Sequence, residues 1–357
     1  MGANESATVK VNFNRSNAFY FGGEKITGNI SFQNVQNKVT VEEILLELIG
    51  ELGYTTQETR WRRNMKGGSH KEHYTEYHHE TFLKIPVSVV RSAHGKKKLT
   101  LRAGSHSWPF ELLLPDCLPP TLVPSSPEQA YVKYYARIVL DNPWSSPDAP
   151  PIYSLIIFPR VNLLQMRATQ ELVEFTNHNR KKVELKGCLL RGGILAGQYI
   201  SIHVDLQNPK QCQIKRIEAT FIQHRQIASI RDQQIIFHSN LPGIDKFQET
   251  NLKQNFDLAV PPGYLAPTYV FTATDSNALF SIFIHYELVL VVKTNGIFTD
   301  FQVNIPVFVG TDSVPDEQHQ QQLNDQFKTS TNGGSLFDMN DLPPSYAMAT
   351  RNELKKC

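Results

Sequence analysis

The residues with the clearest binding chemistry lie near the C-terminus, in the segment Leu342-Pro-Pro-Ser-Tyr346. Pro343 and Pro344 favour the polyproline II conformation, so the segment loses little further entropy when it docks into an aromatic-lined groove. Tyr346 adds a large amphipathic side chain that can be buried as an anchor. This spacing is typical of ligands for WW domains, and we predict that Leu342, Pro343, Pro344 and Tyr346 make the contact.

A second segment with the same spacing, Pro150-Pro-Ile-Tyr153, leads directly into the apolar residues 154–158. A run of this kind is typical of a strand. We therefore interpret Tyr153 as a strand residue and the two prolines as a turn, and expect the C-terminal segment to be the WW ligand.

A basic segment lies within residues 55–80. Arginine and lysine are interleaved there with an aromatic residue and with Gly67 and Gly68, which favours an exposed, mobile hairpin tip. The candidate contact residues are Arg60, Trp61, Arg62, Arg63 and Lys66. Two interpretations remain open: contact with anionic lipid headgroups or acidic tails of membrane proteins, or a solvated loop with scattered charge.

The N-terminal residues Met1-Gly-Ala-Asn-Glu-Ser6 match the pattern for N-myristoylation, with Gly2 as the lipidation site. The alternative is an ordinary disordered start to the chain. One myristoyl chain gives only marginal membrane binding, so a second signal such as the basic segment would be needed.

The sequence holds no pattern for catalysis or for a metal site. A nucleophile elbow, a phosphate-binding loop and a paired-acid motif are all absent. His70, His73, His78 and His79 lie close together, but their spacing matches no known metal site. A net charge of +2 gives no general attraction to nucleic acid. We therefore expect a protein that is not an enzyme and has no cofactor, no metal and no nucleic-acid partner.

The cysteines and the hydropathy pattern indicate a cytoplasmic protein. Cys117, Cys188, Cys212 and Cys357 lie far apart in the chain, which favours free thiols in a reducing compartment. The most apolar stretch, residues 280–292, is interrupted by polar side chains and is too short to span a membrane. The N-terminus also lacks the pattern of a signal peptide.

The elements that must position these segments are indicated by an internal repeat. Residues 23–34 and 197–208 have the same length, begin with glycine and end with Gln-Asn. Both alternate apolar and polar residues, as half-buried strands do. Such repetition predicts two similar folded units. Two further matches follow in the same order, residues 110–121 with 256–267 and residues 134–140 with 285–291.

Residues 41–52 give conflicting local signals, because their apolar side chains also have helical spacing. The repeat decides between the two interpretations. Ile44, Leu46 and Leu48 correspond to Ile217, Ala219 and Phe221, which lie in a segment that alternates as a strand does. We therefore predict a strand.

These patterns predict an all-β chain with two tandem domains and a disordered C-terminal tail, because the composition after residue 310 offers little to bury. The expected parts are a disordered N-terminus over 1–8, a first β domain over 9–158, a linker over 159–170, a second β domain over 171–310, and a tail over 311–357 that contains the Pro-Pro-x-Tyr motif.

Four motifs together resemble the α-arrestins, the arrestin-domain-containing proteins. They are Gly-Gly-Glu-x-Ile-x-Gly at 22–28, Leu-Pro-x-x-Leu-Pro-Pro at 114–120, Asp141-Asn-Pro-Trp144 and the C-terminal Pro-Pro-x-Tyr. The resemblance spans most of the chain. It implies the arrestin fold, with two immunoglobulin-like antiparallel β-sandwich domains in tandem.

The resemblance also implies a function. Members of that family are adaptors that recruit WW-domain HECT-type ubiquitin ligases to the cytoplasmic parts of membrane-protein cargo, at the plasma membrane and endosomes. This promotes ubiquitylation and endocytic sorting. Many relatives have two Pro-Pro-x-Tyr motifs in the tail, whereas this tail has one. One alternative is a trafficking scaffold that acts without a ligase, like arrestin-fold retromer subunits. Another is a redox-linked regulator, since one α-arrestin relative binds thioredoxin through a cysteine, although no motif maps that cysteine onto Cys188 or Cys212.

Overall fold

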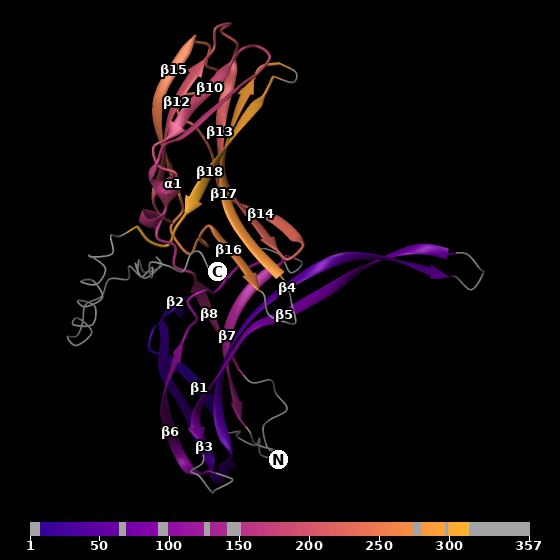
Figure 1. The fold of residues 1–357 in the computed structure, drawn as a ribbon, viewed down its shortest axis with the longest axis vertical. Coiled ribbons are helices and arrows are strands. Elements are labelled where there is room, and N and C mark those ends of the chain that lie inside the picture. The colour runs from indigo at the N-terminus through magenta and orange to yellow at the C-terminus, as the bar shows by residue number, and fades with distance from the viewer. Residues whose placement is uncertain are drawn as a thin grey trace, which may run out of the picture. The chain divides into compact units, whose positions relative to one another are not determined.

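The structure is a computed structural model that describes residues 8–63, 69–91, 99–124, 129–140, 151–273, 280–296 and 299–313. The chain divides into two compact units, with the main boundary between Phe158 and Pro159. Both units consist almost entirely of strands, which confirms the all-β prediction (Figure 1). The residues before 8 and after 313 lie outside the described ranges.

The N-terminal unit contains a three-stranded sheet in the order β1-β3-β6 and a five-stranded sheet in the order β2-β8-β7-β4-β5. Strands β2 and β8 are parallel, and the other neighbours are antiparallel. The strands are β1 (Thr8–Phe13), β2 (Phe19–Phe21), β3 (Lys25–Val41), β4 (Glu43–Arg63), β5 (Ser69–Arg91), β6 (Leu99–Leu113), β7 (Tyr131–Leu140) and β8 (Ile152–Phe158). Alternate apolar side chains of β3 and β4 are buried, as the two inner faces of a sandwich require.

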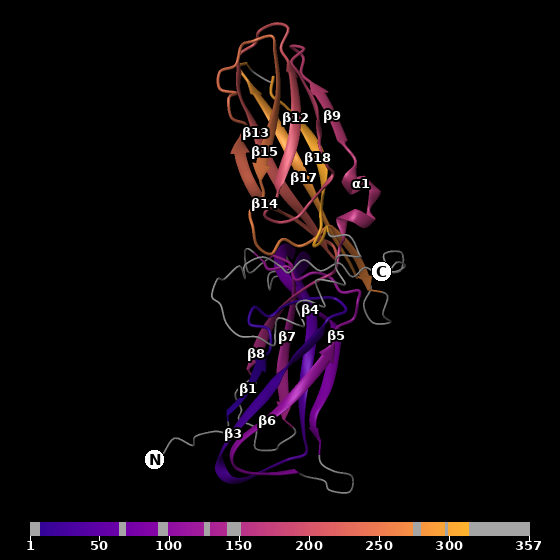
Figure 2. The ribbon, with the colours of Figure 1, turned by 90° about the vertical axis from the view of Figure 1, so that its left-hand side faces the viewer.

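The C-terminal unit repeats this plan with a sheet in the order β15-β12-β10-β9 and a sheet in the order β11-β18-β17-β13-β14, where β16 also pairs with β17. Figures 1 and 2 show the two sheets as layers. Its elements are η1 (Leu163–Gln165), α1 (Arg167–Gln170), β9 (Val173–His178), β10 (Glu184–Leu189), β11 (Gly193–Ile194), β12 (Tyr199–Gln207), β13 (Ile214–Ile227), β14 (Ile230–Asn240), β15 (Asn251–Ala259), β16 (Tyr269–Ala273), β17 (Phe280–Thr294) and β18 (Phe301–Val309).

The repeated stretches have the same backbone geometry in both units. Gly23 and Gly197 each adopt a φ of 79°, a value that glycine tolerates without strain. Each also donates its N–H to a proline carbonyl, Gly23 to Pro115 at 3.1 Å and Gly197 to Pro261 at 3.3 Å. The turn that opens each stretch therefore contacts the same point of the second matched segment.

The side chain after each of these glycines closes the turn in the same way. Glu24 accepts a hydrogen bond from the backbone N–H of Phe21 at 3.0 Å. Gln198 accepts one from the N–H of Leu195, also at 3.0 Å. An acid in one unit and an amide in the other make the same contact, so the internal repeat is structural as well as sequential.

The third match between the units is wrong by one residue. An ungapped match of 134–140 with 285–291 places Tyr134 at the position of His285. In the structure the counterpart of Tyr134 is Tyr286, because both are buried and donate their hydroxyl to a loop carbonyl, of Pro119 at 2.6 Å and of Ala266. Side chains alternate along a strand, so a slip of one residue exchanges the buried and outer faces.

The strand prediction for residues 41–52 is confirmed from Glu43 onward, since β4 includes Ile44, Leu46 and Leu48 as buried residues, whereas Val41 ends β3. The misleading helical spacing has a physical cause. The outer-face residues Leu45 and Ile49 are apolar and at least partly buried, so they interrupt the polar alternation of a half-exposed strand.

Residues 159–170, which the sequence suggests as a linker, belong to the C-terminal unit. The N–H of Leu163 donates to the carbonyl of Asp312 at 2.8 Å, and that of Thr311 donates to Val161 at 2.9 Å. Thr311 and Asp312 are buried there. The start of the C-terminal unit is thus hydrogen-bonded to the residues that follow β18.

The structure agrees only in part with the prediction that the cysteines are free thiols. Cys188 and Cys212 are free thiols with half-buried side chains. Cys117 is disulfide-bonded, so the expectation of free thiols is wrong for this residue.

Candidate functional site

The basic segment lies on a long hairpin of β4 and β5. Strand β4 pairs with β7 only as far as Gly53, opposite Tyr131. Beyond this point, within the described residues, β4 and β5 pair only with each other, up to Arg63 opposite Ser69. We call residues 54–63 and 69–78 the hairpin arm (Figure 1). A two-stranded hairpin has little core of its own, so the arm offers its side chains to solvent or to a partner.

The predicted contact residues divide between the two faces of the arm. Trp61 lies directly opposite Lys71, and Arg60 directly opposite Glu72. Because successive residues point to opposite faces, Trp61 is on one face whereas Arg60 and Arg62 share the other. These three residues therefore cannot all touch one flat surface. The backbone of Arg63 pairs in the ladder, but its side chain and Lys66 lie outside the described part of the structure.

Cross-strand partners contact the cations of the arm, and Glu72 offsets part of the positive charge of one face. Arg60 Nε lies 3.2 Å from one oxygen of Glu72, and Arg62 Nη1 lies 3.2 Å from the other. A hydrogen bond from Arg60 and the charges of both arginines lower the pKa of Glu72. On the other face, Lys71 Nζ lies 5.3 Å from the ring centroid of Trp61, a cation–π contact. The arm therefore presents cations paired with aromatic or acidic groups, and Trp61 remains 66% exposed.

Two buried carboxylates form ion pairs on the outer face of the same sheet. Glu47 Oε1 lies 2.9 Å from Lys84 Nζ, and its Oε2 lies 2.8 Å from Arg137 Nη2. Burial alone would raise the pKa of Glu47, but hydrogen bonds from Lys84 and Arg137 outweigh it and lower that pKa. The group is therefore an anion whose charge is fully partnered.

Glu51 is surrounded in a similar way. Lys133 Nζ lies 2.5 Å and His79 Nε2 3.0 Å from its Oε1, and Tyr135 donates its hydroxyl to Oε2 at 3.0 Å. Burial raises the pKa of Glu51, yet the bonds from Lys133, His79 and Tyr135 lower it overall. Both carboxylates are tied to neighbouring strands, so their role is structural and they are not free to act as acid or base.

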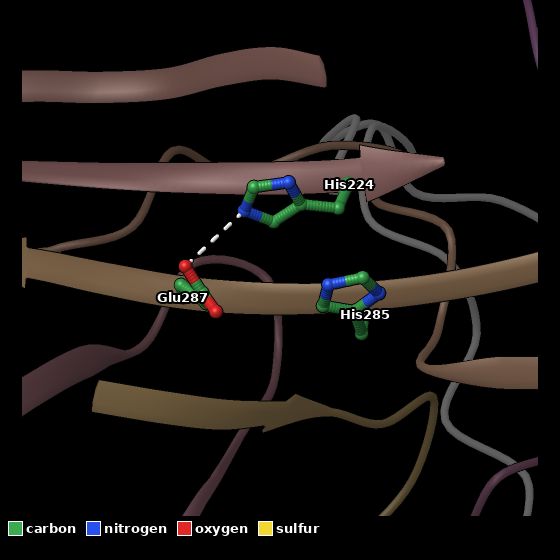
Figure 3. A group of neighbouring side chains, drawn as sticks. All are labelled: His224, His285 and Glu287. Atoms are coloured by element: carbon green, nitrogen blue, oxygen red, sulfur yellow. Dashed lines mark ion pairs between the residues drawn. The ribbon is translucent and has the colours of Figure 1, made fainter. Parts of the chain in front are cut away.

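Another group of polar side chains gathers on the outer face of the C-terminal unit (Figure 3). His224 on β13 lies directly opposite His285 on β17, with Glu287 two residues further along β17. The two imidazole rings are stacked, with centroids 4.7 Å apart and planes 8° from parallel. His224 Nε2 lies 3.4 Å from Glu287 Oε2, and Asn304 Nδ2 donates to that oxygen at 3.3 Å.

The sequence analysis missed this His–His–Glu cluster, because the two histidines belong to different strands far apart in the chain. Burial, followed by the neighbouring His224, lowers the pKa of His285, while Glu287 acts in the opposite direction. Only the pairing register of β13 with β17 brings the groups together. The spacing His-x-Glu at 285–287, which puts both side chains on one face of a strand, was the available signal.

Family models match both units. The arrestin (or S-antigen) N-terminal domain matches residues 9–160, and the arrestin (or S-antigen) C-terminal domain matches residues 179–314. The chain belongs to the arrestin-domain family. The resemblance suggested by the sequence motifs is thereby confirmed, and the two β-sandwich units are arrestin domains.

A curated relative supports this membership. The chain is 31% identical over 136 residues to arrestin domain-containing protein 17 of Caenorhabditis elegans. The match covers 37% of this chain and 30% of that protein, so the chain spans less than a third of the relative's length.

The arrestin-domain matches leave out both terminal motifs. Gly2 precedes the first match, and Leu342, Pro343, Pro344 and Tyr346 follow the second. All of these residues lie outside the described ranges. Within those ranges, no helix has the length and apolar character needed to cross a membrane. Tyr153 is described, and it lies in β8 as the sequence predicts.

Proposed function

We propose that this arrestin-domain protein is a non-catalytic adaptor that links membrane-protein cargo to a WW-domain HECT-type ubiquitin ligase. The observation that supports it is a Pro-Pro-x-Tyr motif about thirty residues beyond the end of the arrestin C-terminal match. The tail supplies the ligase contact, and the arrestin domains supply the surface for cargo. Cargo ubiquitylation and endocytic sorting at the plasma membrane and endosomes would follow.

The hairpin arm is the proposed contact for cargo or for the anionic membrane surface. Its support is Trp61, 66% exposed, beside Lys71 on one face of the arm, and the cations Arg60 and Arg62 on the other face. Each basic residue near an anionic surface adds about 1 kcal/mol of attraction. Glu72 offsets part of this attraction for the two arginines, so the arm alone binds weakly. Acylation of Gly2 would provide the second signal.

The test is a titration of the full-length protein against a protein fragment that carries tandem WW domains. We expect a dissociation constant in the micromolar range, about −8 kcal/mol. Tyr346→Ala removes the buried anchor and should weaken binding by about 2 kcal/mol or more, roughly thirtyfold. Ser345→Ala is the matched control, because this position of the motif has no required side chain, and it should bind as the native chain does.

A second control addresses the other Pro-Pro-x-Tyr match. Pro151→Ala changes an exposed residue just before β8 and should leave WW binding unchanged. If Tyr346→Ala binds as tightly as the native protein, the tail is not the ligase site. The trafficking scaffold that acts without a ligase would then be the better proposal for this arrestin-domain protein.

A further inference from the structure

We propose that His224, His285 and Glu287 bind a divalent metal ion of the Zn²⁺ type on the outer face of the C-terminal unit. Two imidazole nitrogens and one carboxylate oxygen form a ligand set that Zn²⁺ accepts in proteins. One ligand atom from each of the three residues lies within 4.8 Å of the others. The site connects β13 with β17 across the sheet (Figure 3).

The distances are close to those of a bound ion. Ligand atoms about 2.0–2.2 Å from a tetrahedral Zn²⁺ lie about 3.3–3.5 Å from one another. His224 Nε2 and Glu287 Oε2 are already 3.4 Å apart. The ring of His285 is exposed and can rotate about its side-chain torsions, so it can bring one nitrogen into the same range.

The Nε2 nitrogen of His224 has no hydrogen bond within the part of the chain that the structure describes. This atom is buried, and Glu287 is within ion-pair distance. A buried polar atom without a partner costs free energy. An ordinary His–Glu ion pair would be expected to align for a hydrogen bond, whereas a metal ion between the two groups would satisfy both.

The surroundings support ligation. Asn304 donates to Glu287 Oε2 at 3.3 Å, and outer contacts of this kind orient a metal-binding carboxylate. On the same face, Ile222 and Phe283 lie two residues before His224 and His285, respectively. They lie on opposite sides of the His224–His285 pair, since Ile222 is opposite Glu287 and Phe283 is opposite Gln226.

The site would be a binding site and not a catalytic one. It lies on a sheet face with half-exposed and exposed side chains, so the described residues do not enclose a substrate there. Three protein ligands leave one tetrahedral position for water. The bound ion would hold the outer face of β13 against β17.

The test is a calorimetric titration of chelator-treated full-length protein with Zn²⁺. His285→Gln and Glu287→Gln should each bind one equivalent of Zn²⁺ fewer than the native chain. His238→Gln is the matched control, because His238 lies on neighbouring β14, paired with Thr220, outside the cluster, and it should bind as many equivalents as the native chain. Asn304→Ala should keep the site but weaken it by about 10- to 100-fold.

A second measurement separates ligand loss from misfolding. Before Zn²⁺ is added, His285→Gln and His238→Gln, which change exposed residues, should unfold at the same temperature as the native chain. With Zn²⁺, the melting temperature should rise in the native chain and in His238→Gln by mass action, but rise less in His285→Gln. If His285→Gln and Glu287→Gln both bind as many equivalents as the native chain, the cluster is not a metal site and the proposal is wrong.

Discussion

The two arrestin domains place different chemistry at the same position of the repeat. Glu51 faces Lys133, with Tyr135 two residues further along the strand. His224 faces His285, with Glu287 two residues further. The correspondence follows from Tyr134 and Tyr286, since Lys133 and His285 immediately precede these equivalent buried tyrosines. The first domain has an ion-pair cluster around Glu51 there, and the second has two stacked imidazoles beside an acid.

The difference shows which part of a duplicated sandwich is free to change. The inward-facing Tyr134 and Tyr286 have kept the same identity and the same hydroxyl contact with a loop carbonyl. Inner faces must fill a common core at crystal-like density, so substitutions there are costly. Outer faces need only satisfy their polar groups, and the two domains have done so with different residues.

The largest expected effect tests the shared inner face. Leu48 and Phe221 are equivalent, and both are buried. Phe221→Ala should destabilise the C-terminal domain by about 3–5 kcal/mol and Leu48→Ala the N-terminal domain by about 2–5 kcal/mol, through lost burial and cavity formation. Denaturant unfolding of each variant measures this. Losses below about 1 kcal/mol in either would contradict the equivalence of the two cores.

The next prediction compares the Glu51 cluster of the first domain with the His224–His285–Glu287 cluster of the second. Glu51→Gln removes the charge from a carboxylate that is only 3% exposed and has three partners, so it should cost about 1–3 kcal/mol. His224→Gln removes a partner of a half-exposed acid and should cost less than about 1 kcal/mol without metal. Glu111→Gln, in an exposed pair with Lys25, is the control and should be nearly neutral. Equal losses for Glu51→Gln and His224→Gln would remove the distinction.

The two domains should also lose stability in different pH ranges, because different groups titrate in their outer-face clusters. The folded-state pKa values of Glu47 and Glu51 are lowered, so their stabilisation is complete above about pH 5 and lost as the pH falls below about 4.3, through the folded values. The folded-state pKa of His285 is also lowered. Its neutral form is favoured by folding, so stability falls as the pH drops below about 6.5.

Trp61, Trp108 and Trp144 all belong to the first domain, so tryptophan fluorescence follows that domain and calorimetry follows both. We expect the fluorescence-detected melting temperature to be constant from pH 7 to 5 and to fall below that range. Glu51→Gln should make the decrease of this melting temperature below pH 5 smaller. A fluorescence-detected melting temperature that already falls near pH 6 would contradict the assignment of the two pH ranges to the two domains.

The smallest expected effect concerns the exposed end of the same strand that holds Glu51. Arg60→Ala breaks a pair with Glu72 in which the arginine side chain is 60% exposed, so stability should change by less than about 0.5 kcal/mol. Binding to anionic vesicles should nevertheless decrease, because one cation of the arm is lost. An unchanged vesicle affinity for both Arg60→Ala and Trp61→Ala would exclude the arm as a lipid contact.

The sequence by itself determined the β architecture, the duplication and the strand at residues 41–52, because apolar periodicity and turn glycines are local properties of the chain. The Pro-Pro-x-Tyr segment at 342–346, which we propose as the ligase contact, also comes from the sequence, since it lies outside the described residues. Periodicity did not fix the register of residues 134–140 against 285–291, since a slip of one residue preserves the pattern while exchanging the faces.

Tertiary structure decided what meets across strands. Long-range pairing divided Trp61 and Arg62 between two faces of the arm, surrounded Glu51 with cations, and brought His224 to His285. Such contacts depend on the partner strand that the register selects. The register depends on the packing of all strands in both sheets, and local residue patterns do not contain this information.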